Sequence, residues 1–274
     1  MFILVDDKNR ENEGDLVIPA SKCNSKNINF MAKNGRGLIC LALTKKQVDK
    51  LNLPLMSPVN RARMQTAFTV SIEAKKGITT GISAFDRAKT IKVAINNKSK
   101  KKDIVSPGHV FPLVARNGGV LERAGHTEAS VDISKLAKLN ASAVICEVMN
   151  EDGRMARYDD LIKFSKKHKL KIASIEDLIS YRLKNEKLII NTDIKKINIK
   201  KYGNHEVRIF KNKLDGSEHY AIIKGKFKLK KSTRVRVLST NIIDNIINFN
   251  KNFLNTSLKY LSKYNNFALI LIKN

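Results

Sequence analysis

The sequence predicts an α+β fold, in which a layered α/β sandwich is followed by a small β-rich C-terminal region. Over residues 1–187, short apolar runs alternate with segments whose apolar residues recur at helical spacing. This alternation is typical of strands covered by helices. After Lys187 the composition shifts to lysine, asparagine and isoleucine. We therefore expect two domains, residues 1–187 and residues 188–274.

Five apolar runs predict the strands of the first domain. The first two, residues 2–5 and 16–18, flank an acidic turn, and the third, GLICLAL, contains Cys40. The fourth and fifth runs, residues 67–73 and 143–148, are rich in apolar side chains and have the length of a strand.

Helices are expected between these strands. Thr44 with Gln47, and Ser174 with Asp177, have the spacing of capping boxes that open helices. No Rossmann or Walker sequence accompanies these helices, so a nucleotide-binding fold is not indicated. The expected helices are residues 45–52, 84–95, 128–139 and 158–168.

The run DDKNRENEGDL places several carboxylates between two apolar strands. Crowded carboxylates repel one another unless a cation neutralises them, although a solvated acidic turn is the alternative. Farther along the chain, RAGHTEA and VICEVMNEDGRMAR add a histidine and more carboxylates. Because hard divalent cations prefer carboxylate oxygens, a metal or polyol site is indicated. The carboxylates of the first run are Asp6, Asp7, Glu11, Glu13 and Asp15.

Five blocks together, DDKNRENEGDL, GISAFDRAKTI, PGHVFPLVA, GGVLERAGHTEA and VICEVMNEDGRMAR, resemble the 3,4-dihydroxy-2-butanone 4-phosphate synthases of riboflavin biosynthesis over most of residues 1–185. The resemblance implies that family's α+β sandwich, usually a homodimer with active sites near the subunit interface. It also implies a lyase that converts D-ribulose 5-phosphate to 3,4-dihydroxy-2-butanone 4-phosphate and formate, with Mg2+ or Mn2+ as the cofactor.

The resemblance assigns roles to single residues of this chain. Glu11 and His126 match the metal ligands, and His109 and Glu147 match the residues that transfer protons. Histidine suits that role because it titrates near neutrality. The implied substrate-binding residues are Arg10, Glu11, Asp15, Arg123, Ala124, Gly125, His126, Thr127 and Glu147.

Three further residues are minor site candidates. Cys40 is either a small buried apolar residue or a thiol near the substrate, and Glu13, like Asp7, would add negative potential around the metal. Thr80 lies in ITTGISAFDRA, where a helix start could hold the substrate phosphate or simply be capped by its own Ser83. Asp86 and Arg87 of this block would either support the loop or contact the ligand.

The C-terminal region, through HEVRIFKNKLDGSEHYAIIKGKF, resembles the opening of a GTP cyclohydrolase II domain. That activity depends on a zinc ion held by three cysteines, whereas the last cysteine of this chain is Cys146. We therefore expect a degenerate region without cyclohydrolase activity, a small β-rich unit with a terminal helix.

The net charge of +27 raises a second class of function, nucleic-acid binding. Residues 186–274 hold 19 basic and 6 acidic side chains, but the lysines are scattered and no nucleic-acid-binding motif is evident. A non-catalytic scaffold of the riboflavin pathway is a third reading. The three cysteines are odd in number and widely spaced, and no signal peptide or long apolar run is present, so a cytoplasmic protein is expected.

Overall fold

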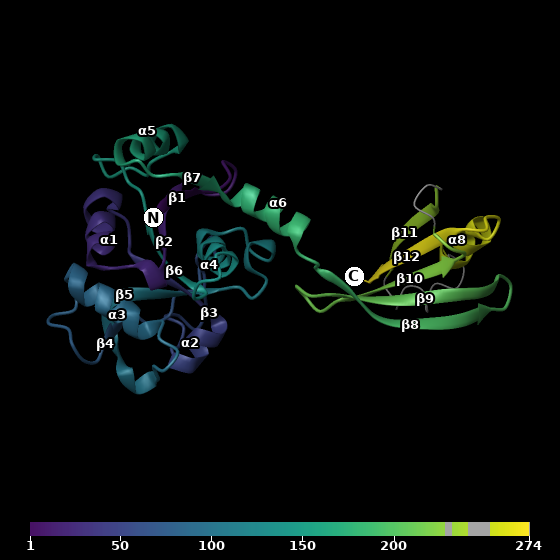
Figure 1. The fold of residues 1–274 in the computed structure, drawn as a ribbon, viewed down its shortest axis with the longest axis horizontal. Helices are drawn as coiled ribbons and strands as arrows, with labels where there is room; N and C mark the ends of the chain where they lie inside the picture. The colour runs from purple at the N-terminus through teal and green to yellow at the C-terminus, as the bar shows by residue number, and fades with distance from the viewer. Residues whose placement is uncertain (228–231, 241–252, 274) are drawn as a thin grey trace. The chain divides into compact units, whose positions relative to one another are not determined.

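The computed structural model describes residues 1–227, 232–240 and 253–273. The chain divides into two compact units, Met1–Asn185 and Glu186–Asn274 (Figure 1). This boundary lies two residues before the one expected from composition. No helix of the described residues is long and apolar enough to cross a membrane.

The first unit is built on a seven-stranded mixed sheet with the order β4-β5-β3-β6-β2-β1-β7. Strand β3 runs parallel to β5, and β1 runs parallel to β7, while the other neighbours are antiparallel. The strands are β1 (Phe2–Val5), β2 (Gly14–Pro19), β3 (Cys40–Thr44), β4 (Ile72–Ala74), β5 (Ile104–Ala115), β6 (Ser142–Glu147) and β7 (Ile172–Ser174).

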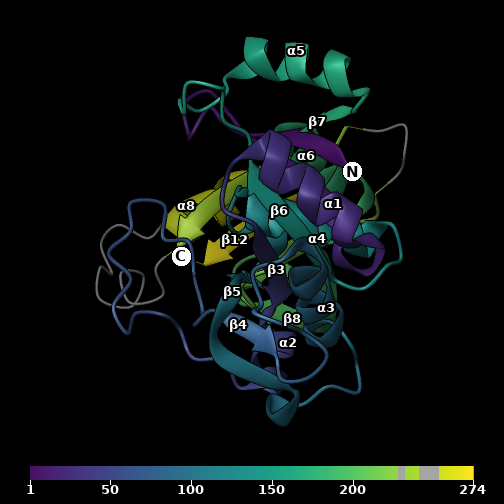
Figure 2. The ribbon, with the colours of Figure 1, turned by 90° about the vertical axis from the view of Figure 1, so that its left-hand side faces the viewer.

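Helices surround this sheet in the first unit, as the two views of the ribbon show (Figures 1 and 2). They confirm the predicted α+β class. The α-helices are α1 (Ser25–Phe30), α2 (Lys45–Leu51), α3 (Ala84–Ala94), α4 (His126–Leu136), α5 (Tyr158–His168) and α6 (Ile175–Asn185). Short 3-10 helices lie at Ala20–Lys22, Lys101–Asp103 and Gly119–Leu121, and a π-helix follows α1 at Met31–Gly35.

Each face of the sheet has its own core. On β6, Val144 belongs to the cluster that includes Ile28 of α1 and Leu161 of α5. The next residue, Ile145, belongs to the cluster that includes Ala129 of α4. Because successive side chains of a strand point to opposite faces, α4 covers one face of the sheet and α1 and α5 cover the other.

The strand predicted at residues 67–73 is mostly wrong. Strand β4 spans only Ile72–Ala74, and Phe68 and Thr69 form isolated bridges to different partners. The physical reason lies in β5, where Pro112 has no N–H to donate, so a continuous ladder cannot form beside it. Its carbonyl instead accepts a bond of 3.0 Å from the Thr69 N–H.

Two predicted helix details also differ. Helix α4 begins at His126 rather than residue 128, with Gly125 as its N-cap. Thr44 does cap α2, since its hydroxyl accepts from the Gln47 N–H, but the Gln47 side chain donates to the Ala94 carbonyl at 2.6 Å. The predicted capping box is therefore only half formed.

The second unit contains a five-stranded sheet with the order β11-β12-β10-β9-β8. Its core includes Ile222, Phe267 and Leu269, packed against Leu258 and Leu261 of helix α8. The unit is β-rich and contains a helix near its end, α8, as expected, but this helix is not terminal, because β12 follows it and lies inside the sheet. The elements are β8 (Ile189–Ile199), β9 (Gly203–Asn212), β10 (Glu218–Lys224), β11 (Arg234–Thr240), α8 (Phe253–Leu261) and β12 (Phe267–Lys273).

Candidate active site

The acidic loop between β1 and β2 is folded around the carboxylate of Asp6. This carboxylate accepts the backbone N–H of Glu11 at 3.1 Å and that of Glu13 at 2.9 Å, and Arg10 pairs with it at 2.8 Å. The side chain of Asp6 is fully buried. Asp6 therefore organises the loop, and the loop presents the carboxylate of Glu11, which also pairs with Arg10 at 3.0 Å.

Arg157, the residue before α5, holds the same loop from another direction. Its guanidinium donates to the carbonyls of Glu11 at 2.8 Å and Asn12 at 2.7 Å. It also lies 3.6 Å from the Glu13 carboxylate. Sequence reasoning did not find this contact, although Arg157 closes the block VICEVMNEDGRMAR and is next to the predicted helix start.

Glu11 and Asp15 converge on His126, the first residue of α4. Nδ1 of His126 lies 3.6 Å from the Glu11 carboxylate and 4.0 Å from that of Asp15. Asp15 and His126 are both buried, with 3% and 6% of their surface exposed. Three segments of the chain, the acidic loop, β2 and the start of α4, thus meet at one point.

These groups shift one another's ionisation. Burial opposes the charged form of His126, but the neighbouring carboxylates, Asp15 first, outweigh it and raise the pKa of the imidazole to about 9. Burial also raises the pKa of Asp15 to about 7, against the pull of His126. His126 and Arg10 lower the pKa of Glu11, whereas burial raises that of Glu13.

The residues at this point fit a divalent cation. Ligand atoms of Asp6, Glu11 and His126 lie within 4.8 Å of one another. The 3.6 Å between Glu11 and His126 is too long for a hydrogen bond, but two atoms that share one Mg2+ ion can be up to about 4.2 Å apart. The Asp6 oxygens already accept the hydrogen bonds that fold the loop. Glu11 and His126 are therefore the better metal ligands.

Glu147 lies next to Asp15. The two residues are register partners on β6 and β2, and Glu147 accepts the backbone N–H of Leu38 at 2.8 Å. A side chain at Gly37 would meet the Glu147 carbonyl at 2.5 Å and its carboxylate at 2.6 Å. The segment before β3 can therefore approach Glu147 only because it has a glycine there.

Cys40 lies on β3, where it pairs with Ile145 of β6. Its thiol is buried and free. Burial, with the negative charges of Glu147 and Asp15 nearby, raises the pKa of Cys40 far above its ordinary value. Cys40 is thus a small buried residue with a neutral thiol, and it also lies near Glu147 and Asp15, two of the expected substrate-binding residues.

The Arg123 guanidinium is already engaged by protein groups. It pairs with Glu128 at 2.6 Å and donates to the Met64 carbonyl at 2.9 Å and the Thr66 hydroxyl at 3.0 Å. A Cβ at Gly125 would lie 2.2 Å from this guanidinium. Arg123 therefore anchors residues 64–66 next to the start of α4 in this structure.

The rest of the RAGHT block forms the N-terminal end of α4. Gly125 is the N-cap and contributes no side-chain hydrogen bond to the first turn. Thr127 is buried, and Ala124 packs against the core cluster on the α4 face of the sheet. The backbone N–H groups of the first turn are the groups that a helix start can offer to an anion or a carbonyl oxygen.

His109 lies on β5, and β3 separates that strand from the strand of Glu147. The two expected proton-transfer residues are thus not neighbours on the sheet. The side chain of His109 contacts the carboxylate of Glu73 on β4.

The loop before α3 is supported by Asp86. The carboxylate accepts the Thr79 hydroxyl at 2.7 Å and the Gly81 N–H at 3.1 Å, and these bonds, that from Thr79 first, lower the pKa of Asp86. Ser83 caps α3 by accepting the Asp86 N–H at 3.0 Å. Thr80 is exposed. Of the two readings of Asp86, the structure has the supporting one.

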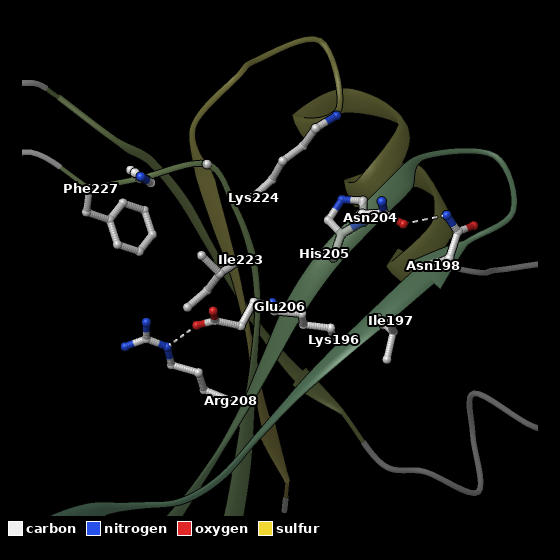
Figure 3. A pocket seen from close by; sticks show the side chains of 12 residues that line it. Lys196, Ile197, Asn198, Asn204, His205, Glu206, Arg208, Ile223, Lys224 and Phe227 are labelled. Carbon is white, nitrogen blue, oxygen red and sulfur yellow. Dashed lines mark hydrogen bonds and ion pairs between the residues drawn. The ribbon is translucent and has the colours of Figure 1, made fainter.

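The second unit contains a cavity of about 860 Å3 at the end of its sheet (Figure 3). Lys196, Arg208 and Lys224 line it, and Glu206, the one carboxylate among the described residues that line it, pairs with Arg208 at 2.5 Å. The imidazole of His205 also lines it. The cavity is basic, unlike the acidic site of the first unit, and all three cysteines of the chain lie in that first unit.

Family models match both units. Residues 1–181 match 3,4-dihydroxy-2-butanone 4-phosphate synthase, and residues 191–273 match GTP cyclohydrolase II. The chain belongs to the 3,4-dihydroxy-2-butanone 4-phosphate synthase family. The chain is 53% identical over 241 residues to riboflavin biosynthesis protein RibBA of Aquifex aeolicus (strain VF5), an alignment that covers 87% of this chain and 59% of that protein.

Solved structures agree with the fold. RibBX of A. baumannii, a two-domain 3,4-dihydroxy-2-butanone 4-phosphate synthase, superposes with a TM-score of 0.80 at 42% identity and covers 99% of this chain and 77% of that one. A synthase in complex with two magnesium ions gives a TM-score of 0.64 at 38% identity, over 67% of this chain and 91% of that one. The predicted fold class and the suspected family are confirmed.

Proposed function

We propose that this chain converts D-ribulose 5-phosphate to 3,4-dihydroxy-2-butanone 4-phosphate and formate in riboflavin biosynthesis. The observation that carries the proposal is the convergence of Glu11 and Asp15 on the buried start of α4 at His126, with Glu147 paired with Asp15 across β6 and β2. The identity of the substrate is inferred from membership of the synthase family. This chain spans less than two thirds of the length of relatives such as RibBA of Aquifex aeolicus. The proposal therefore concerns only the activity of the shared part.

The reaction requires proton transfers at carbons and oxygens beside a carbonyl, through enolisation, loss of water, rearrangement and release of formate. Glu147 and His109 are the proposed proton carriers. Burial raises the pKa of Asp15, which pairs with Glu147 across the sheet, and this carboxyl is a further candidate to hold a proton. Arg10, Thr127 and the backbone at Gly125 would orient substrate oxygens, as would Arg123 through its place beside α4.

We propose Mg2+ or Mn2+ as the cofactor, held by Glu11 and His126. When bound, the cation would stabilise negative charge on oxygens beside the substrate carbonyl. Asp6 fixes the loop that carries Glu11 and would keep this ligand in place. The synthase structure that is in complex with two magnesium ions supports this choice.

We further propose that the second unit has no GTP cyclohydrolase II activity, although residues 191–273 match that family. The support is chemical, since a three-cysteine zinc site needs thiols and the chain has none after Cys146. The proposal also includes a cytoplasmic homodimer, supported by the three free cysteines and by the usual assembly of the family.

Nucleic-acid binding is the alternative that a specific observation favours. The lysines are not uniformly scattered, because several from separate segments line one cavity of about 530 Å3 in the first unit. Oligonucleotide binding that weakens steeply with salt and has no sequence preference would mark it as an incidental property of this surface. The lining lysines are Lys75, Lys76, Lys89, Lys98 and Lys102.

The experiment that tests the proposed function measures both products. Purified protein is incubated with D-ribulose 5-phosphate and Mg2+, and formate and the four-carbon phosphate are quantified. We expect them in equal amounts. Folded, metal-loaded protein that releases neither product would overturn the synthase assignment and leave the non-catalytic scaffold.

A further inference from the structure

The side chain of His109 has a specific partner on the neighbouring strand. Its Nδ1 atom contacts a carboxylate oxygen of Glu73, which lies on β4, the antiparallel neighbour of β5. The Glu73 side chain is only 16% exposed, whereas that of His109 is 44% exposed. The carboxylate is thus largely enclosed by protein, and the ring that it contacts reaches the surface.

The contact fixes which ring nitrogen carries the proton. An ionised carboxylate only accepts hydrogen bonds, so Nδ1 of His109 must be the donor. In the neutral imidazole the remaining nitrogen, Nε2, then has the free lone pair. The ring is held in the form in which Nε2 can accept a proton from a substrate.

The backbone also positions His109. The pairing of β4 with β5 shifts between Ile72 and Glu73, and the extra residues bulge out of β5 just before Val110. A bulge of this kind changes the direction of a side chain. The bulge requires glycine at position 108, since a Cβ at Gly108 would lie 2.2 Å from the backbone of Ile72. The Gly108 N–H also donates to the Ser71 hydroxyl at 3.1 Å.

The loop before α3 closes over the contact. A Cβ at Gly81 would lie 1.8 Å from the Glu73 carboxylate and 2.8 Å from Nδ1 of His109. The φ of Gly81, +90°, also favours glycine at this position. Asp86 anchors this loop through the Gly81 N–H. Gly81 therefore packs closely against the Glu73 carboxylate and the Nδ1 side of the ring, and it helps to hold the two side chains in contact.

We propose that Glu73 is a positioning residue for the reaction, which acts by orienting His109 and holding it in the tautomer that leaves the Nε2 lone pair free. The inference rests on the proposed function, because His109 is one of its two proton carriers. Glu73 lies outside the five blocks that carry the family resemblance, and its role emerges only from the contact across β4 and β5.

The test compares Glu73→Ala and Glu73→Gln with the wild-type protein. Asp103→Asn is the matched control, because it also turns a carboxylate into an amide beside β5 and its partner is the Lys100 N–H. We expect Glu73→Ala to lower kcat about 100-fold and Glu73→Gln, whose amide oxygen still accepts from Nδ1, about tenfold. KM for ribulose 5-phosphate changes less than about threefold, and Asp103→Asn stays within about twofold of wild-type kcat.

A second readout does not depend on turnover. The ring nitrogen signals of 15N-labelled protein, with five histidines in all, are assigned by the signal lost in His109→Asn. We expect a protonated Nδ1 at His109 in the wild type and a mixture of the two tautomers in Glu73→Ala. Either an unchanged tautomer or wild-type kcat in folded Glu73→Ala would overturn the proposal.

The two assays separate the inference from the function on which it rests. Wild-type protein that releases no formate contradicts the proposed function, while the nitrogen signals still report whether Glu73 fixes the tautomer. Wild-type activity with a normal Glu73→Ala variant contradicts the inference alone.

Discussion

The two units of this chain differ in the sign and the burial of the charged side chains at their candidate sites. In the first unit, Asp6, Glu11 and Asp15 lie with His126 in a mostly buried cluster, and burial and neighbouring charges shift the pKa values of Glu11, Asp15 and His126. In the second unit, Lys196 and Lys224 line an open cavity.

The difference shows where to look for chemistry in a strongly basic chain. Exposed lysines keep their hydration and constrain the fold very little, whereas buried carboxylates must have partners or a cation. The net charge of +27 therefore says less about function than a few acidic groups that the fold forces together.

The largest expected effect falls on Glu147. Glu147→Gln keeps an oxygen that can accept the Leu38 N–H but cannot exchange a proton, so we expect formate release to fall about 1,000-fold with thermal unfolding unchanged. Steady-state formate assays and calorimetry measure the two effects. Near-normal turnover by this variant would remove Glu147 from the proposed chemistry.

The next largest effect is expected on the Mg2+ dependence of activity when Glu11 is replaced. Glu11→Gln loses the charged ligand, and we expect the Mg2+ concentration for half-maximal activity to rise at least about tenfold. Glu13→Gln is the comparison on the same loop: it removes negative potential but no proposed ligand, so we expect a smaller rise in this Mg2+ concentration than for Glu11→Gln. If both variants titrated alike, Glu11 would not be distinguished as a ligand.

A smaller effect is expected at Arg157, which holds the acidic loop through two carbonyls. Arg157→Ala should lower the free energy of unfolding by about 1 kcal/mol, because the side chain is half exposed, and reduce turnover about tenfold by loosening Glu11. Urea unfolding and formate assays measure these changes. Arg157→Lys, which can still donate to one carbonyl, should fall between the alanine variant and the wild type.

The smallest effect is expected in the second unit. Lys224→Ala removes a cation from the basic cavity and should leave formate release within about twofold of the wild type. A large loss of synthase activity would show that the two units are functionally coupled and that their contrast is incomplete.

Sequence reasoning could predict the fold class and the segments that form the acidic site, because apolar runs and clustered carboxylates are local patterns. It could not predict the broken strand at residues 67–73, which depends on Pro112 of a distant strand. The contacts of Arg157 with the acidic loop and of Glu73 with His109 likewise join residues far apart in the sequence. Such contacts depend on strand order and register, which no single segment encodes.

The central claim is that one unit is a metal-dependent synthase and the other has no cyclohydrolase activity. The most direct test measures formate release from ribulose 5-phosphate with Mg2+ and then with EDTA, beside GTP consumption with added Zn2+ on the same sample. The account predicts formate that EDTA abolishes and no loss of GTP. Formate release that EDTA does not affect, or zinc-dependent consumption of GTP, would contradict it.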